Sequence, residues 1–222
     1  LDIPLDSLPS IKPSMFNYGT NEGILKNVPI TAVLGDQQAS LFGQNCISSG
    51  DVKNTYGTGC FALTNTGSEI VHSNNGLLST VAYQKDGDKP QYAIEGSVSI
   101  AGAAVQWLRD NLNIIKESSD IEALAMAEKD NGDVYFVPAF SGLFSPHWDE
   151  TARGVLVGLS RFSNKSHIAR AVLESVAYQS NELLESMEKD IGITFESVNV
   201  DGGMVVNNLL MQFQSDIFNK KV

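Results

Sequence analysis

The chain has 222 residues, of which 42% are hydrophobic and 18% charged, so it can bury a core and is not a disordered polymer. It has 15 lysine and arginine residues and 26 aspartate and glutamate residues, which gives a net charge of −11. A surface this acidic repels phosphate backbones and anionic lipids, which argues against nucleic acid and membrane surfaces as partners. No apolar run approaches the roughly 20 residues that a membrane-spanning helix needs.

The cysteines and histidines give no sign of a metal site. Cys46 and Cys60 are too few for a disulfide framework and have no CxxC spacing, so we expect small buried thiols. Reduced cysteines are typical of a cytoplasmic protein. The three histidines are widely separated and lack the spacing of metal ligands, so we expect no metal-binding residue.

The composition divides the chain into two parts. Residues 1–27 are rich in Pro, Ser, Asn and Gly, which predicts a connector or a peripheral hairpin. Residues 28–222 alternate strand-like and helix-like stretches, which predicts an α/β layer fold. The chain starts at Leu1 without an initiator Met and stops shortly after its last helical stretch, so we expect a piece of a longer protein.

The first half of the larger part is predicted to be mainly strands. A β-branched run at 28–34 predicts a strand, and a helix follows from Asp36. Strands are predicted at 52–56 and 60–64, joined by the turn Gly57-Thr58-Gly59. Two further strand-like runs at 78–83 and 91–94 flank a polar loop and predict a hairpin.

The second half is predicted to be mainly helical. Helices are expected at 98–112, 121–129, 166–190 and 207–218, the second entered through N-cap residues in 118–120. Gly192 follows the longest helix as a C-terminal stop signal. Short strands are predicted at 134–137 and 198–201.

Three predicted strands end in polar or glycine-rich turns, at 35–37, 57–59 and 201–203. Ligands of open α/β sheets collect at the carboxyl ends of strands, where glycine lets backbone N–H groups approach an oxygen-rich ligand. Each turn alone is more typical of an ordinary tight turn. Together the three turns favour a phosphate-handling site and a purely structural role about equally.

The best single candidate for chemistry is Asp36, which could accept a proton from a substrate hydroxyl, with Gln37 binding the same hydroxyls. The alternative is that Asp36 is only a helix N-cap. Gly102 and Gln106 stand four residues apart on one helix face, where a flat ligand could lie. The alternative there is close helix packing, with Trp107 in the core.

Several longer segments together carry a specific resemblance. They are 35–44, 53–61, 95–97, 102–110, 136–143, 148 with 152–154, 170–179 and 200–216. In content and order they resemble the FGGY family of carbohydrate kinases, and the resemblance covers about residues 28–222.

The resemblance implies a ribonuclease-H-like lobe of the actin/hexokinase/Hsp70 superfamily, with a mixed sheet flanked by helices. Residues 28–222 would be the second of two lobes, incomplete at the C-terminus, and the absent N-terminal lobe would be its partner. The implied reaction phosphorylates glycerol with ATP and Mg²⁺, and the fragment alone would be inactive. The alternatives are a kinase that acts on another polyol or sugar, and a non-catalytic module that binds a nucleotide. The protein could also form a homo-oligomer.

The resemblance also implies roles for single residues. Asp36 resembles the catalytic base, Gln37 a glycerol contact and Phe61 the apolar wall beside the glycerol carbons. Thr58 resembles the contact to the ATP phosphates. The contacts on the adenosine side would be Gly102, Gln106, Gly203 and Asn207.

Overall fold

The computed structural model describes residues 3–222, so residues 1–2 of the predicted connector lie outside the described residues. A five-stranded sheet forms the centre, in the order β3-β4-β2-β1-β7. β1 and β7 are parallel, and the other neighbouring pairs are antiparallel. The strands are β1 (Val52–Tyr56), β2 (Cys60–Gly67), β3 (Leu78–Tyr83), β4 (Gln91–Val98) and β7 (Asn199–Asp201).

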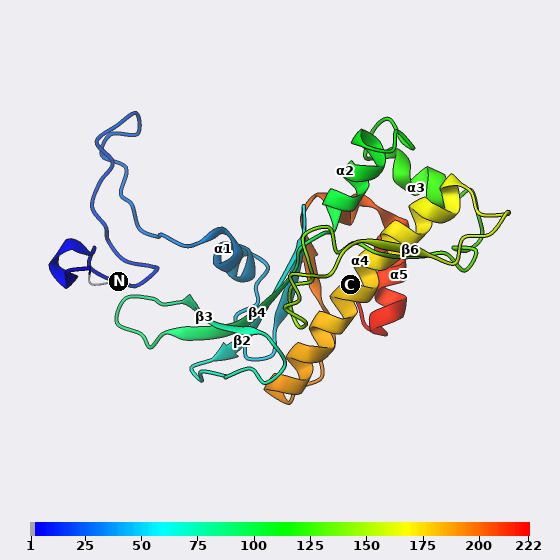
Figure 1. The fold of residues 1–222 in the computed structure, drawn as a ribbon. Coiled ribbons are helices and arrows are strands. Elements are labelled where there is room, and N and C mark those ends of the chain that lie inside the picture. Colours follow the sequence, from blue (N-terminus) through cyan, green and yellow to red (C-terminus); the bar gives the residue numbers. More distant parts are fainter. Residues whose placement is uncertain (1–2) are drawn as a thin grey trace.

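Helices cover both faces of this sheet. Helix α1 (Asp36–Gly43) lies on one face, and α4 (Lys165–Ile191) and α5 (Asn208–Phe218) lie on the other (Figure 1). The larger core fills the face under α4 and includes Ile94 and Leu183, whereas a smaller cluster around Leu41 and Leu63 lies under α1. The mixed sheet flanked by helices confirms the predicted fold class.

The long helix α4 has clear signals at both ends. Its N-cap Asn164 accepts a hydrogen bond from the backbone N–H of Ser166, and His167 completes a capping box. It ends at Gly192, whose φ of 69° is the left-handed conformation that glycine adopts without strain. The helix predicted at 166–190 is therefore confirmed.

Two shorter helices stand at one end of the sheet. Helix α2 (Gly102–Asp110) begins later than predicted because Val98 is the last residue of β4. The N-cap of helix α3 (Asp120–Ala125) is Ser119, within the predicted 118–120, although its side chain makes no capping hydrogen bond. Instead the Asp120 carboxylate accepts hydrogen bonds from the backbone N–H groups of Lys116 and Glu117.

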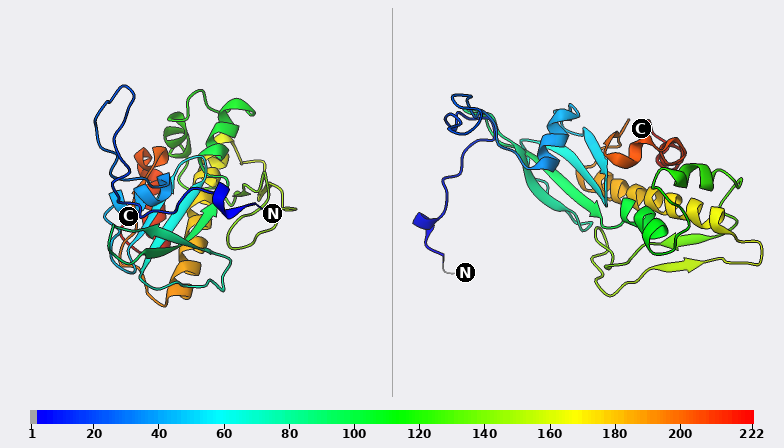
Figure 2. Two further views of the ribbon diagram at one scale, coloured as in Figure 1. Left: turned by 90° about the vertical axis from the view of Figure 1, so that its left-hand side faces the viewer. Right: turned by 90° about the horizontal axis from the view of Figure 1, so that it is seen from above.

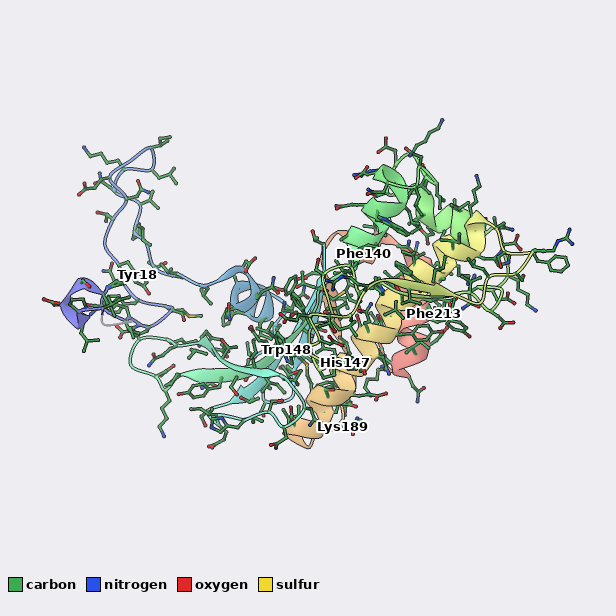
Figure 3. The ribbon with its side chains drawn as sticks, viewed as in Figure 1. Tyr18, Phe140, His147, Trp148, Lys189 and Phe213 are labelled. Carbon is green, nitrogen blue, oxygen red and sulfur yellow. The ribbon has the colours of Figure 1, made fainter. Side chains whose placement is uncertain are left out.

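A two-stranded sheet, β5 (Tyr135–Val137) and β6 (Val155–Val157), adds a second layer beside α4. The loop between its strands is held at two points (Figure 3). Trp148 Nε1 donates to the carbonyl of Gly76 at 2.7 Å, and His147 Nε2 lies 3.0 Å from a carboxylate oxygen of Glu182 on α4. The sequence analysis did not predict β6.

The strand predicted at 28–34 is not formed. The segment pairs irregularly with residues 14–21, as shown by the hydrogen bonds from Tyr18 N to Ile30 O and from Ile30 N to Gly19 O. Val28 and Val33 stay 48% and 56% exposed, because the partner is one open segment and not the sheet. This peripheral hairpin, preceded by the 3-10 helix η1 (Leu5–Ser7), projects beyond the β3–β4 turn (Figure 2). The domain boundary at residue 27 stays a prediction.

Within residues 3–222, none of the helices has both the length and the apolar character that crossing a membrane requires.

Candidate functional site

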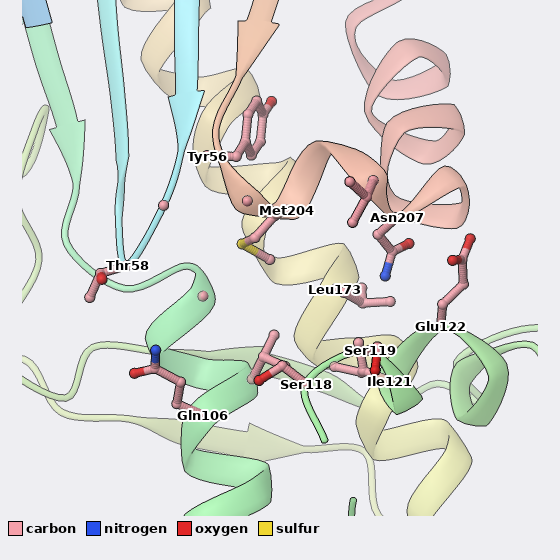
Figure 4. A pocket seen from close by; sticks show the side chains of 15 residues that line it. Tyr56, Thr58, Gln106, Ser118, Ser119, Ile121, Glu122, Leu173, Met204 and Asn207 are labelled. Carbon is pink, nitrogen blue, oxygen red and sulfur yellow. The ribbon is translucent and has the colours of Figure 1, made fainter. Parts of the chain in front are cut away.

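A cavity of about 560 Å³ opens at the end of the sheet where β1 and β7 finish (Figure 4). Its walls come from the β1–β2 turn, α2, α3, α4 and the segment from η2 (Gly203–Val206) to the start of α5. All five residues predicted to contact the nucleotide line this one cavity: Thr58, Gly102, Gln106, Gly203 and Asn207.

Backbone hydrogen bonds fix the β1–β2 turn against α2. The carbonyl of Gly57 accepts from Gly102 N at 3.0 Å, and the carbonyl of Thr58 accepts from Ala103 N at 3.0 Å. A Cβ on Gly102 would lie 2.6 Å from the Gly57 carbonyl oxygen, so only glycine allows this approach. The exposed Thr58 is thereby held at the rim of the cavity.

The two glycines after β7 have different surroundings. Gly202 has a φ of 96°, and a Cβ there would lie 2.4 Å from the carbonyl oxygen of Tyr56. A Cβ on Gly203 would meet no heavy atom within 4 Å, and Gly203 lines the cavity. Gly202 is therefore required by the backbone, whereas Gly203 leaves space that a ligand can use.

The start of α5 is capped from two sides. The Asn207 side-chain oxygen accepts from Leu210 N at 2.8 Å, and the Glu122 carboxylate of α3 accepts from Leu209 N at 2.9 Å. With its oxygen engaged, Asn207 turns its amide nitrogen toward the cavity (Figure 4). The sequence analysis missed Glu122 and its neighbours Ser118 and Ser119 as cavity residues, because nothing local in α3 shows that it packs beside α5.

A second group of predicted residues gathers at the start of α1. Asp36 is the first residue of the helix, its N-cap is Gly35, and its carboxylate accepts from Gln37 N at 2.8 Å. The alternative that Asp36 is the N-cap is therefore wrong. Gln37 and Phe61 border a small cavity of about 90 Å³, and Phe61 is 39% exposed.

Lys53 lies beneath this group and was not predicted to belong to it. Its side chain is fully buried on β1, and its ammonium donates to Gln37 Oε1, to Thr55 Oγ1 at 2.8 Å and to the carbonyl of Phe61 at 3.0 Å. Burial lowers the pKa of Lys53 to about 8, against the opposing effect of nearby negative charge, foremost Asp201. The available signal was a lysine inside an otherwise buried strand, since lysine is almost never fully buried unless it is paired.

Asp201, at the end of β7, connects this group to the larger cavity. Its Oδ2 accepts from Ser40 Oγ at 2.6 Å and from Gln44 Nε2 at 3.2 Å, both on or next to α1. Burial raises the pKa of the Asp201 carboxyl, but hydrogen bonds from Ser40, Thr55 and Gln44 outweigh it, so the pKa is lowered. Because Gly202 and Gly203 follow directly, Asp201 connects α1 to a residue that lines the cavity.

The described part of the chain, residues 3–222, contains no group of three or more His, Cys, Asp or Glu side chains placed to hold a metal ion. Both cysteines are buried and free, as predicted.

Comparison with known proteins decides the family. The profile of the FGGY family of carbohydrate kinases, C-terminal domain, matches residues 52–222. The chain belongs to the FGGY family of carbohydrate kinases. It is 60% identical to a glycerol kinase of Brucella anthropi over 222 residues, which are 100% of this chain and 44% of that protein. The chain thus spans less than half the length of the curated relatives that it matches.

Solved structures of a glycerol kinase and a xylulose kinase have the same fold. A glycerol kinase of Plasmodium falciparum solved with ADP superposes with a TM-score of 0.88 at 42% identity, covering 97% of this chain and 44% of that chain. A xylulose kinase of Lactobacillus acidophilus gives a TM-score of 0.77 at 26% identity, covering 89% of this chain and 39% of the other.

Proposed function

We propose that this chain is the C-terminal, nucleotide-binding lobe of a glycerol kinase, which transfers the γ-phosphoryl group of ATP to a hydroxyl group of glycerol. The observation that carries the proposal is the joint placement of two groups on β1 and β7. A cavity lined by Thr58, Gly102 and Gly203 opens at the carboxyl ends of these strands, and Asp201 joins it to the helix that bears Asp36.

Glycerol is favoured over other polyols and sugars by the degree of similarity. The chain is 60% identical to a protein named glycerol kinase and only 26% identical to a xylulose kinase of the same fold. The alternative of a mere nucleotide-binding module is disfavoured by Asp36, an exposed carboxylate that nucleotide binding alone does not need.

In this proposal Asp36 is the general base that accepts the proton of the attacking hydroxyl. Its carboxylate stands in the open at the first turn of α1, where a hydroxyl can reach it. The neighbouring Gln37 hydrogen-bonds a substrate hydroxyl, and the exposed ring of Phe61 packs against the carbon chain. Positioning and electrostatic stabilisation provide most of the catalysis in phosphoryl transfer, so small displacements of these groups matter.

On the nucleotide side, Thr58 contacts the phosphates at the β1–β2 turn. Gly102, Gln106, Gly203 and Asn207 surround the adenosine in the adjoining cavity. Magnesium bound to the nucleotide phosphates would neutralise charge on the transferred phosphoryl group, since Mg²⁺ is commonly held by phosphates, waters and one or two carboxylates.

Two wider parts of the proposal concern the cell and the whole enzyme. We place the protein in the cytoplasm, which the two reduced cysteines support. Its partner is the N-terminal lobe of the same kinase, which would close the other side of the cleft; the relatives, of which this chain spans 44% or 45%, have room for such a lobe.

The direct test is a substrate comparison with the full-length kinase. ADP release coupled to NADH oxidation should give a kcat/KM for glycerol at least about a hundredfold above those for xylulose and gluconate, since positioning of the attacking hydroxyl dominates the rate. A preference for either sugar substrate would replace glycerol, and ADP release independent of any polyol would leave only nucleotide hydrolysis.

A further inference from the structure

The buried lysine Lys53 has no role in the proposed chemistry as described so far. Lysine loses much hydration when it is fully buried, so a protein retains it at a buried position only with strong partners. The partners of Lys53 are the side chain of Gln37, the hydroxyl of Thr55 and the carbonyl of Phe61. Two of these three residues are the proposed glycerol contacts.

We propose that Lys53 is a positioning residue for the sugar-alcohol substrate: it holds the amide of Gln37 in the single orientation that presents an N–H donor to a substrate hydroxyl. This inference rests on the proposed function, because it takes Gln37 and Phe61 to face the substrate.

The chemistry of the contact fixes the amide. An ammonium group has three donors and no acceptor, so the atom of Gln37 that it meets must be the oxygen Oε1. The other end of the amide, Nε2, then points away from Lys53 and carries two donors. A hydroxyl that accepts from Gln37 Nε2 can give its own proton to the carboxylate of Asp36, the preceding residue. The amide orientation thus sets which way the attacking hydroxyl faces.

The frame around Lys53 is rigid. Lys53 and Thr55 project from the same face of β1, and Phe61 projects to that face from β2, where it pairs with Thr55. The hydroxyl of Thr55 lies 3.4 Å from that of Ser40, which donates to Asp201 at 2.6 Å. Lys53 is therefore part of a polar network that joins β1, β2, β7 and α1, and it can place Gln37 without moving itself.

The electrostatic surroundings favour the charged form of Lys53 at neutral pH. Burial lowers the pKa of Lys53, and the nearby carboxylates of Asp201, Asp36 and Glu95 oppose that effect. The charge remains even though the pKa is lowered, since about 8 still exceeds neutral pH.

The test is a double-mutant cycle between Lys53 and Gln37 in the full-length kinase. Lys53→Met keeps the aliphatic stem and removes the charge, and we expect kcat/KM for glycerol to fall about ten- to a hundredfold, the range for a lost charged hydrogen bond. The KM for ATP should change less than about twofold, because the nucleotide cavity is elsewhere. In a Gln37→Ala background, Lys53→Met should cost less than about twofold more, since the amide that it orients is gone.

A purely structural lysine predicts a different result. If Lys53 were purely structural, Lys53→Met would lower kcat/KM by the same factor in both backgrounds and would raise the KM values for glycerol and for ATP. That outcome would overturn the inference. Lys85→Met, at an exposed lysine near the end of β3, is the matched control and should leave all constants unchanged.

A second variant keeps the inference testable where Lys53→Met fails to fold. Gln37→Glu retains the contact with Lys53, as an ion pair, but a carboxylate has no donor for the substrate. We expect a normal melting temperature and a KM for glycerol raised about tenfold or more. An unchanged KM in Gln37→Glu would overturn the inference. A wild-type kinase without activity on glycerol would instead overturn the proposed function. Failure of the inference and failure of the proposed function are therefore distinguishable.

Discussion

At the scale of single residues, the carboxylate of Asp36 is separated from the stability of the fold. It is exposed, it is not the N-cap of α1, and its one hydrogen bond is to the N–H of the next residue. Its favourable interaction with the helix dipole is worth about 0.3–1 kcal/mol. Chemistry and stability can therefore be measured independently at this position.

We expect Asp36→Asn in the full-length kinase to lower kcat about 10²–10⁴-fold, the usual loss when a general base is removed. The KM for ATP should stay within about twofold, because the nucleotide cavity is built from other elements, and the melting temperature should barely change. Steady-state kinetics and thermal unfolding of the same preparation check this. A near-normal kcat in a folded Asp36→Asn variant would remove Asp36 from the mechanism.

The thiol of Cys60 provides a prediction about pH. Full burial raises its pKa from 9.0 to about 12. A raised folded-state pKa means that the thiol's contribution to stability is fully present below pH 9 and is lost as the pH rises toward about 12. The free energy of unfolding should therefore fall less steeply over that range in Cys60→Ala than in the wild-type chain. Equal slopes in urea titrations would show that Cys60 ionises as easily in the folded state.

At the scale of elements, the turn after β7 contains two glycines with opposite expected behaviour. Gly203→Val should weaken ADP binding at least about tenfold without lowering the melting temperature. The valine side chain would meet no protein atom nearby and would occupy space in the cavity that Gly203 lines. Gly202→Val should lower stability by about 1–3 kcal/mol or more, from its positive φ and its contact with the Tyr56 carbonyl.

Titration calorimetry and thermal unfolding on both variants separate the two roles. Unchanged ADP affinity in Gly203→Val would mean that the ligand does not use this part of the cavity. Unchanged stability in Gly202→Val would show that the backbone can relax around the Tyr56 carbonyl.

The elements that could be predicted from the sequence are those whose signals are local. Strands β1 and β2 were found because strand-like runs stand on either side of the Gly57–Gly59 turn, and α4 because a long apolar period ends at Gly192. The run at 28–34 has the same β-branched pattern but no sheet to join, so its valines stay exposed. A pattern describes one segment, whereas a strand requires a partner.

The candidate site was predictable to a similar extent. The cavity brings together Thr58, Gly102, Gln106, Gly203 and Asn207, which are separated by up to 149 positions, and only the family resemblance had grouped them. Lys53 and Glu122 were missed, because their roles depend on contacts between β1 and α1 and between α3 and α5. Such contacts are made by the fold; the one local sign was a lysine inside the buried strand β1, which does not show what the lysine contacts.

At the scale of the whole molecule, the proposed substrate residues stand on an open surface. Asp36 is exposed and Phe61 is 39% exposed, so this lobe alone cannot exclude water from a reacting hydroxyl and phosphate. The cavity proposed for the nucleotide, by contrast, is lined by several elements of this chain, so part of the nucleotide contacts are present without a second lobe. Phosphoryl transfer to the substrate therefore depends on a second lobe more strongly than nucleotide binding does.

We expect the isolated chain of 222 residues to bind ADP but not to phosphorylate glycerol. This chain supplies only part of the contacts to the nucleotide. Binding should therefore be at least about tenfold weaker than in the full-length kinase, where contacts from both lobes offset the translational and rotational freedom that the ligand loses. Turnover requires both reactants to be held in line within a closed cleft, which this chain cannot form alone.

Titration calorimetry with ADP measures the first expectation, with Gly203→Val as the control for binding in the cavity. A coupled assay of ADP release measures the second. Glycerol-dependent turnover by the isolated chain, abolished by Asp36→Asn, would show that one lobe carries the whole reaction and would overturn the two-lobe proposal.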